Sequence, residues 1–116
     1  MTTHNFSVEE IVLALIERLD RRNIFPPMSN APETFLPKID DSIDLSLRRP
    51  KKCPNAFFIC KRNVQDEAAR RGAFNMRVIT KATGILWRTA SSEEQEVYNQ
   101  LASRVEELHW RRTSTI

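Results

Sequence analysis

Apolar residues recur at helical spacing in four stretches of this chain, and each stretch predicts a helix. The first stretch predicts a helix over residues 8–23, and its apolar positions share one face: Ile11, Val12, Leu15, Ile16 and Leu19. Ser7 is a suitable cap for the first turn, and Glu10 three residues later completes a capping box. The pattern fits two interpretations: a helix that packs within the protein, or a helix that docks a partner protein.

The other three stretches lie in the second half of the chain. They predict helices over residues 55–71, 76–88 and 92–111. Gly72 is suited to end the first of these helices, because glycine readily adopts the left-handed conformation of a helix end. Asn75 is suited to cap the second helix, and Ser91 or Ser92 the third. No stretch predicts a strand and the chain has only two glycines, so we expect an all-α protein.

A proline-containing stretch separates the first helix from the other three. Residues 26–46 carry four prolines and no sustained period, which predicts an extended linker. The charge changes along the chain, since residues 1–47 hold four Lys/Arg and eight Asp/Glu, whereas residues 48–116 hold fourteen and seven. A basic half joined to an acidic half indicates an anionic partner, with nucleic acid the first candidate and an acidic membrane surface the second.

Several classes of function are disfavoured by the sequence. Cys53 and Cys60 would lie about 10 Å apart on one helix, too far for a disulfide, and no Cys/His spacing resembles a zinc site. The chain has no Gly-rich phosphate loop and no Ser/His/Asp order, so we expect neither enzymatic activity nor a cofactor. No stretch approaches the roughly 20 apolar residues of a membrane span, and the N-terminus lacks a signal-peptide pattern, which predicts a soluble intracellular protein.

Two adjacent phenylalanines open the second predicted helix, and they cannot face the same core. At 100° per residue, Phe57 begins a stripe that packs inward and continues through Cys60, Val64 and Ala68. Phe58 lies on a neighbouring face that continues through polar residues and is flanked by lysine and arginine. An apolar ring beside cations is suited to unstack a base step in the minor groove. A half-exposed phenylalanine without a function is the ordinary alternative.

The second half of the chain resembles a high-mobility-group (HMG) box, and most of all the fungal mating-type group. The resemblance rests on "RRPKKCPNAFFICKR" and "ITKATGILWRTASSEEQEVYNQLA", which hold the ordered motifs of that family at its spacing. These motifs are a basic strap with a proline, Asn55-Ala56-Phe57, Ile79-Thr80-Lys81, Gly84 with Trp87, Ser92-Glu93-Glu94, and Tyr98 with Leu101-Ala102. The resemblance divides the chain into an N-terminal amphipathic helix (1–25), an acidic linker (26–47), the box (48–112) and a tail (113–116).

The resemblance implies an L-shaped fold of three helices whose concave face grips a widened minor groove. It implies that Asn55 contacts base edges, although an N-cap role for Asn55 is equally compatible with its position. It makes Phe58 the intercalating wedge. It also implies a structural core that contains the aromatic and aliphatic residues Phe57, Trp87, Tyr98 and Leu101.

Three positions depart from the family pattern. Cys53 replaces the first proline of a Pro-Pro pair, and Cys60 replaces the usual Trp or Tyr two residues past the wedge. Met76 and Arg77 stand where sequence-specific boxes commonly carry polar residues. Because non-specific boxes use a second apolar wedge at the position of Met76, the resemblance leaves sequence specificity open, while Asn55 favours it.

The candidate DNA contacts are mostly cations, and each could instead be an ordinary solvated charge. The expected phosphate contacts are Arg48, Arg49, Lys51, Lys52, Lys61, Arg62, Arg77, Lys81, Arg111 and Arg112. Thr80 is either a further contact or an ordinary residue of the helix interior. We expect a nuclear, sequence-specific transcription regulator that binds and bends A/T-rich double-stranded DNA. The alternatives are a non-specific architectural DNA-bending protein, or an adaptor that docks a protein through residues 8–23.

Overall fold

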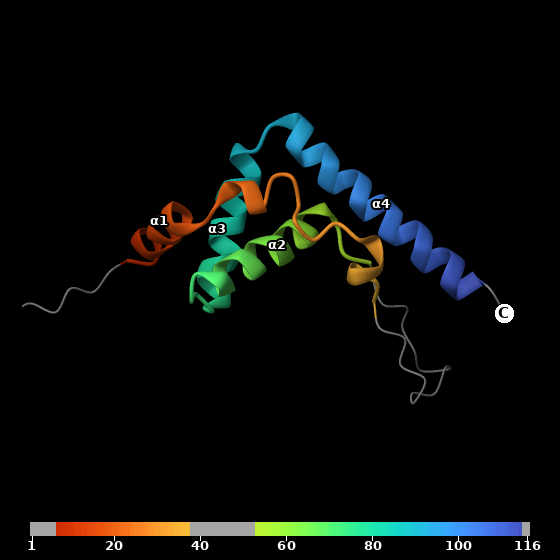
Figure 1. Ribbon diagram of the computed structural model, residues 1–116, viewed down its shortest axis with the longest axis horizontal. Coiled ribbons are helices and arrows are strands. Elements are labelled where there is room, and N and C mark those ends of the chain that lie inside the picture. The colour runs from red at the N-terminus through yellow and green to blue at the C-terminus, as the bar shows by residue number, and fades with distance from the viewer. Residues whose placement is uncertain (1–6, 38–52, 115–116) are drawn as a thin grey trace, which may run out of the picture.

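A computed structural model describes residues 7–37 and 53–114, and these residues form four α-helices, two short 3-10 turns and no strand. The elements are α1 (Val8–Arg18), η1 (Arg21–Asn23), η2 (Pro32–Phe35), α2 (Ala56–Arg70), α3 (Met76–Thr89) and α4 (Ser92–Ser114). The all-α expectation is therefore confirmed for the described residues. In Figure 1, α3 and α4 meet at one end and diverge, and α2, which packs against both, lies between them.

The helix boundaries follow from local hydrogen bonds that the sequence signals. The Ser7 hydroxyl accepts the Glu10 N–H (3.2 Å), which confirms the predicted cap of α1. Ser91 and Glu94 form a reciprocal capping box before α4, with hydrogen bonds of 3.1 and 2.8 Å. Gly72 ends α2 in a left-handed conformation (φ 77°), as predicted.

The first helix is shorter than predicted, because it ends at Arg18 and not near residue 23. Leu19 is extended (ψ 140°), and the chain then forms the separate turn η1. The Asp20 carboxylate accepts the Arg22 N–H (3.0 Å) and so caps that turn. Asp20 donates its own N–H to the Glu67 carboxylate (2.9 Å). In a continuous helix this N–H would donate within the helix and could not bind Glu67.

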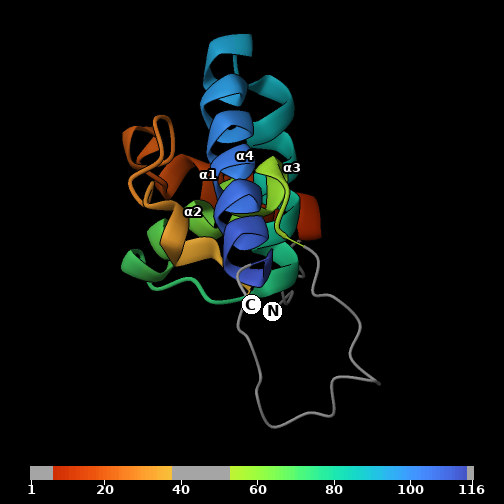
Figure 2. The same ribbon diagram turned by 90° about the vertical axis from the view of Figure 1, so that its right-hand side faces the viewer.

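The chain between α1 and residue 37 packs against the helices, whereas the sequence predicted an extended linker from residue 26. Ile24, Phe25 and Phe35 are buried in the hydrophobic core, and η2 packs against α4. Figure 2 shows residues 20–37 (orange) along one side of α4. We call residues 7–37 the N-terminal segment, and this segment is part of the folded unit. Residues 38–47 of the predicted linker lie outside the described residues.

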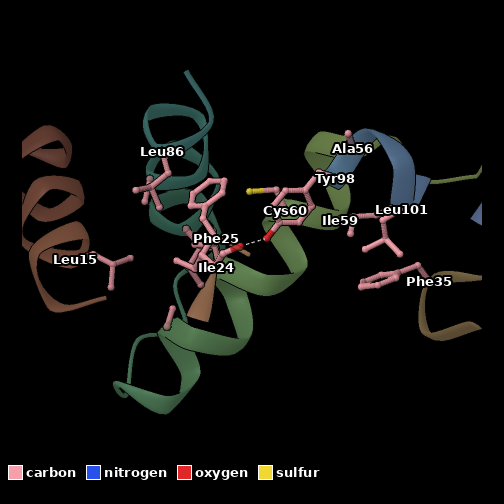
Figure 3. Packing of buried hydrophobic residues seen from close by; sticks show 14 of the residues in the cluster. Leu15, Ile24, Phe25, Phe35, Ala56, Ile59, Cys60, Leu86, Tyr98 and Leu101 are labelled. Atoms are coloured by element: carbon pink, nitrogen blue, oxygen red, sulfur yellow. Dashed lines mark hydrogen bonds between the residues drawn. The ribbon is translucent and has the colours of Figure 1, made fainter. Parts of the chain in front are cut away.

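Tyr98 lies at the centre of the core and joins the N-terminal segment to the other helices (Figure 3). Its ring makes edge-on contacts with Phe25 (5.7 Å between ring centroids) and with Trp87 (5.9 Å). Its hydroxyl donates a hydrogen bond to the carbonyl oxygen of Ile24. Burial raises the pKa of both Tyr98 and the adjacent Cys60 thiol, the latter to about 12, so both groups are uncharged near neutral pH.

Two buried polar side chains of α2 hold the N-terminal segment in place. The Asn63 amide accepts the Ser29 N–H (2.8 Å) and donates to the Ser29 carbonyl oxygen (3.2 Å). The Glu67 carboxylate accepts four hydrogen bonds of 2.9 Å, from the Asp20 N–H and from the side chains of Asn23, Arg70 and Arg71. Burial favours a raised pKa for Glu67, but these hydrogen bonds outweigh burial and lower its pKa to about 2.

Candidate nucleic-acid interface

The first turn of α2 presents Phe58 outward, as the helical spacing predicts, but Phe57 is not one of the buried core residues that the sequence predicted it to be. Phe57 is half-buried and contacts Trp87 edge-on, with 6.5 Å between the ring centroids. Phe58 is 52% exposed. At 100° per residue, Phe58 lies about 140° from Asn63 and about 180° from Glu67 around α2. The hydrogen bonds of the N-terminal segment to Asn63 and Glu67 therefore lie on the opposite side of α2 from Phe58. Phe35 of the same segment lies against Arg62, about 40° round the helix from Phe58.

A lysine supports the outward ring from the next turn of α2. The Lys61 Nζ lies 5.0 Å from the centroid of the Phe58 ring, within the range of a cation–π interaction. The Lys61 side chain is half-buried, so its aliphatic stem covers α2 while its ammonium group stays beside the ring. The pair thus places an apolar ring and a positive charge side by side at the surface.

Asn55 caps α2, and this role leaves part of its side chain for other contacts. Its Oδ1 atom accepts the Phe58 N–H (2.9 Å), and the residue itself is exposed. The cap uses the acceptor of the amide, while the Nδ2 group retains its two donors. Minor-groove edges of A·T pairs present only acceptors, so the group that remains matches the chemistry found there. The cap and the predicted base contact are therefore geometrically compatible.

Three cations form an exposed stripe along α3 on the side away from the core. Arg77, Lys81 and Arg88 are exposed, and at 100° per residue they lie within about 40° of one another and opposite the buried Ile79. Arg88 was not among the residues singled out from the sequence, although its spacing of seven residues from Lys81 and eleven from Arg77 places it on the same side of the helix. Thr80, which the sequence suggested as a contact, is half-buried beside this stripe.

The half-buried contact of Phe57 with Trp87 brings the first turn of α2 next to the last turn of α3. We use the term cationic face for Phe58, Lys61, Arg77, Thr80, Lys81 and Arg88. Within the described residues, none of its four cations forms an ion pair with a carboxylate. No carboxylate among the described residues therefore neutralises the positive charge of this face.

Other arginines are neutralised by the fold. Arg21 binds Glu94 through two hydrogen bonds (2.5 and 2.7 Å), and this contact with Arg21 lowers the pKa of Glu94 to about 2. Arg22 pairs with Asp20 (3.1 Å). Arg70 and Arg71 both pair with Glu67. These pairs hold the N-terminal segment or lie within it, whereas the four cations of the cationic face have no such carboxylate partner among the described residues.

The remaining sequence-predicted contacts are distributed over several places. Arg62 is exposed, with its guanidinium 5.7 Å from the centroid of the Phe35 ring, and so borders the N-terminal segment. Arg111 pairs with Glu107 (2.5 Å) on α4, and Arg112 donates to the Pro37 carbonyl oxygen (2.5 Å). Tyr98 and Leu101 are buried in the core. The predicted strap contacts lie outside the described residues: Arg48, Arg49, Lys51 and Lys52.

A second exposed apolar area lies at the turn between α2 and α3. Met76, the first residue of α3, is 41% exposed, and Phe74 in the turn is 72% exposed. Phe74 was not singled out from the sequence, since a turn residue belongs to no periodic pattern. It borders a groove of about 400 Å³ along α1, lined by apolar and charged residues of α1, by residues 73–75 of the turn and by Val78 of α3.

The apolar face of α1 that the sequence suggested as a docking surface is largely used inside the protein. Val12 and Leu15 are buried, and α1 packs against α3. Only the outer positions of the helix are available to a partner, among them Ile11 and Leu13, which are exposed. A protein that docks on residues 8–23 would have to contact this outer surface.

No described helix is long and apolar enough to cross a membrane, and no group of His, Cys, Asp or Glu among the described residues could hold a metal ion. Comparisons with protein-family models, with curated proteins and with solved structures find no match to this chain. The geometry of the cationic face is therefore the basis on which a function is proposed.

Proposed function

We propose that this chain binds double-stranded DNA in the minor groove in the manner of an HMG box, inserts the Phe58 ring between two base pairs and bends the duplex. The observation that carries the proposal is the exposed Phe58 ring on the first turn of α2, with the Lys61 ammonium group 5.0 Å from its centroid. A wedge needs an apolar group that is free to leave the protein surface and cations beside it to hold the phosphates.

The surroundings of the ring support this use of the surface. The cations of the cationic face lack carboxylate partners within the described residues, so they can neutralise phosphates without breaking internal ion pairs. Asn55 offers its amide donors at the start of the same helix, next to the ring. The polar contacts of the N-terminal segment with Asn63 and Glu67 lie on the far side of α2, and the Phe58 ring is exposed.

The resemblance to HMG boxes supplies the rest of the proposal. An L-shaped arrangement of α2, α3 and α4 with the cationic face inside the bend would follow the family, and the basic residues 48–52 would act as its strap. Transcription regulation and a nuclear location belong to the same proposal, because they follow from the fungal mating-type group. These statements rest on the motifs of the sequence, and the geometry is compatible with them.

The proposal is tested by measuring DNA bending for two matched phenylalanine variants. Phe58→Ala should reduce the bend of a short A/T-rich duplex, measured by energy transfer between dyes at its ends, more than it reduces affinity. Phe74→Ala removes an even more exposed ring that lies outside the cationic face, and it should leave the bend unchanged. Equal bending by Phe58→Ala and the wild type, or no binding at low salt, would refute the proposal.

A non-specific architectural role is the second candidate, and the exposure of Met76 favours it. Met76 opens α3 with 41% of its surface exposed, next to Arg77, so a second apolar wedge could enter the groove there. Competition between an A/T-rich duplex and a scrambled duplex of equal composition distinguishes the two candidates. A sequence-specific regulator prefers the first duplex, whereas an architectural protein binds both equally.

A further inference from the structure

The outer side of α1 carries an apolar groove that nothing in the DNA-binding proposal uses. The groove has a volume of about 400 Å³ and runs between α1 and the turn before α3. Ile11 (43% exposed) and Ala14 form its α1 wall, and Phe74 forms the opposite wall. Exposed apolar surface of this kind, bounded by charged residues, is typical of a protein–protein contact.

The charged residues at the groove require a particular arrangement of charges in the molecule that occupies it. Glu10 and Arg18 both line the groove, and they lie eight residues apart on α1, about 12 Å along the helix axis. Ala14 is midway between them. An occupant must therefore present an apolar centre, a cation about 6 Å to one side of that centre and an anion about 6 Å to the other side.

The same stripe of α1 in a second copy of the chain meets this requirement. When two α1 helices run antiparallel and cross at Ala14, Glu10 of each copy lies opposite Arg18 of the other. The small side chain of Ala14 at the crossing point allows the two helices to approach closely. Each α1 would then lie between α1 and Phe74 of the other copy, so that one symmetric contact fills both grooves.

We propose that this groove is the contact surface of a two-fold symmetric dimer, in which the α1 helices pack antiparallel through Ile11 and Ala14 and pair Glu10 with Arg18 of the other copy. The hydrogen bond from the Arg18 guanidinium to the Arg71 carbonyl oxygen is compatible with this contact. It uses one of the five N–H donors of the arginine, and the carboxylate of the other copy takes others. The dimer does not depend on DNA binding, and either proposal can fail while the other stands.

Charge exchange tests the pairing, and sedimentation velocity of the full chain over a range of concentrations up to millimolar is the measurement. Glu10→Arg and Arg18→Glu should each weaken the homodimer by on the order of tenfold in Kd, because each places like charges opposite one another at both ends of the contact. An equimolar mixture of the two variants should recover the dimer as a heterodimer, since all four charges are then opposite in sign. A mixture that stays monomeric overturns the pairing.

The apolar part of the contact has its own matched control. Ile11→Glu and Phe74→Glu should abolish the dimer at concentrations where the wild type associates, whereas Leu13→Glu should leave it intact. Leu13 is 55% exposed on the same helix but does not line the groove. Circular dichroism shows whether each variant is folded, and Phe74→Glu changes a residue with little internal packing. A wild-type chain that remains monomeric, or equal weakening by Leu13→Glu, overturns the proposal and leaves the groove to a different protein.

Discussion

Replacing Glu67 with glutamine tests whether a single buried carboxylate holds the N-terminal segment to α2. Both carboxylate oxygens act as acceptors, because Oε1 binds Asn23 and Arg70, and Oε2 binds the Asp20 N–H and Arg71. Glutamine keeps the size of the side chain but turns one of these oxygens into an NH2 group. The two donors that were bound to that oxygen then face the NH2 group, which is itself a donor, at a side chain that solvent does not reach.

Two independent arguments give a similar size for this effect. At either oxygen one of the two donors belongs to an arginine that is nearly half exposed and can turn to water, so one buried donor is left without an acceptor, which costs about 1–3 kcal/mol. The pKa of Glu67 falls from 4.5 to about 2 on folding, and at 1.36 kcal/mol per unit this corresponds to about 3 kcal/mol. We expect Glu67→Gln to reduce the free energy of unfolding by about 3 kcal/mol at neutral pH, and the midpoint of thermal unfolding by on the order of 15 °C.

The dependence of this effect on pH follows from the direction of the pKa change. A carboxylate whose pKa is lower in the folded state stabilises the fold fully above its unfolded pKa, here 4.5, and loses that contribution as the pH falls toward 2. The difference in stability between the wild type and Glu67→Gln should therefore shrink between pH 5 and pH 2. Glu94, whose pKa is also about 2, is present in both proteins and does not enter the difference.

Urea unfolding followed by circular dichroism measures both expectations, and Glu17→Gln is the matched control. Glu17 is exposed on α1, so the same substitution there should change the free energy of unfolding by no more than about 0.5 kcal/mol. Hydrogen exchange at the Asp20 and Ser29 amides reports the attachment of the N-terminal segment directly, since these N–H groups donate to Glu67 and Asn63. The reasoning is refuted when Glu67→Gln behaves like Glu17→Gln, or when the difference in stability does not change with pH.

Three further predictions concern the core and the end of α2. Tyr98→Phe should lower the free energy of unfolding by about 1–2 kcal/mol in urea titrations, because the Ile24 carbonyl oxygen loses its donor; an unchanged midpoint would contradict the role of this hydrogen bond. A thiol reagent at pH 8 should modify Cys53 before Cys60, whose buried thiol has a pKa of about 12, and the two should react equally only in denaturant. Gly72→Ala should lower the free energy of unfolding by about 1 kcal/mol through the φ of 77° alone, since no atom lies within 4 Å of the added methyl group. An unchanged midpoint of thermal unfolding would contradict this.

The features that could be predicted from the sequence are those that depend on near neighbours in the chain. The caps at Ser7, Asn55 and Asn75, and the glycine end of α2, are formed by residues two to four positions away from the groups they satisfy. The same holds for the outward direction of Phe58, which follows from 100° per residue. Local rules of this kind act before any tertiary contact forms and can be read from short stretches.

The packing of the N-terminal segment could not be predicted, because its partners are distant in the sequence. Glu67 and Asn63 are polar residues that a helical pattern assigns to solvent, and they are buried only because backbone groups 34 to 47 positions earlier bind them. Ile24, Phe25 and Phe35 belong to no periodic stretch, so they gave no signal of their place in the core. A proline-containing stretch with isolated large apolar residues is thus compatible with a packed segment as well as with a linker.

The candidate site was predictable in part for the same reason. Phe58, Lys61, Arg77 and Lys81 were identified from spacing and resemblance, and each lies at the surface of the first turns of α2 or α3. Which cations are neutralised within the protein could not be predicted, because Arg21 binds Glu94 across 73 positions of sequence. Pairing of this kind decides how many positive charges remain for an anionic partner.

The salt dependence of DNA binding should therefore follow the unpaired cations and not the net charge. Each phosphate contact contributes about −0.9 to the slope of log K against log salt. The four cations of the cationic face would give a slope of about −3.6, and participation of the four basic residues between 48 and 52 would extend it to about −7. Arg77→Gln should reduce the magnitude of the slope by about 0.9.

Arg22→Gln is the control for this prediction, because it removes the same charge from a site that the fold neutralises. The Arg22 side chain is 90% exposed, yet it pairs with Asp20 on the far side of α2 from Phe58. Exposure alone would make Arg22 as good a phosphate contact as Arg77. When the two substitutions change the slope equally, the bound phosphates are held by the general positive charge of the protein and not by the cationic face, and the minor-groove orientation proposed for α2 and α3 is wrong.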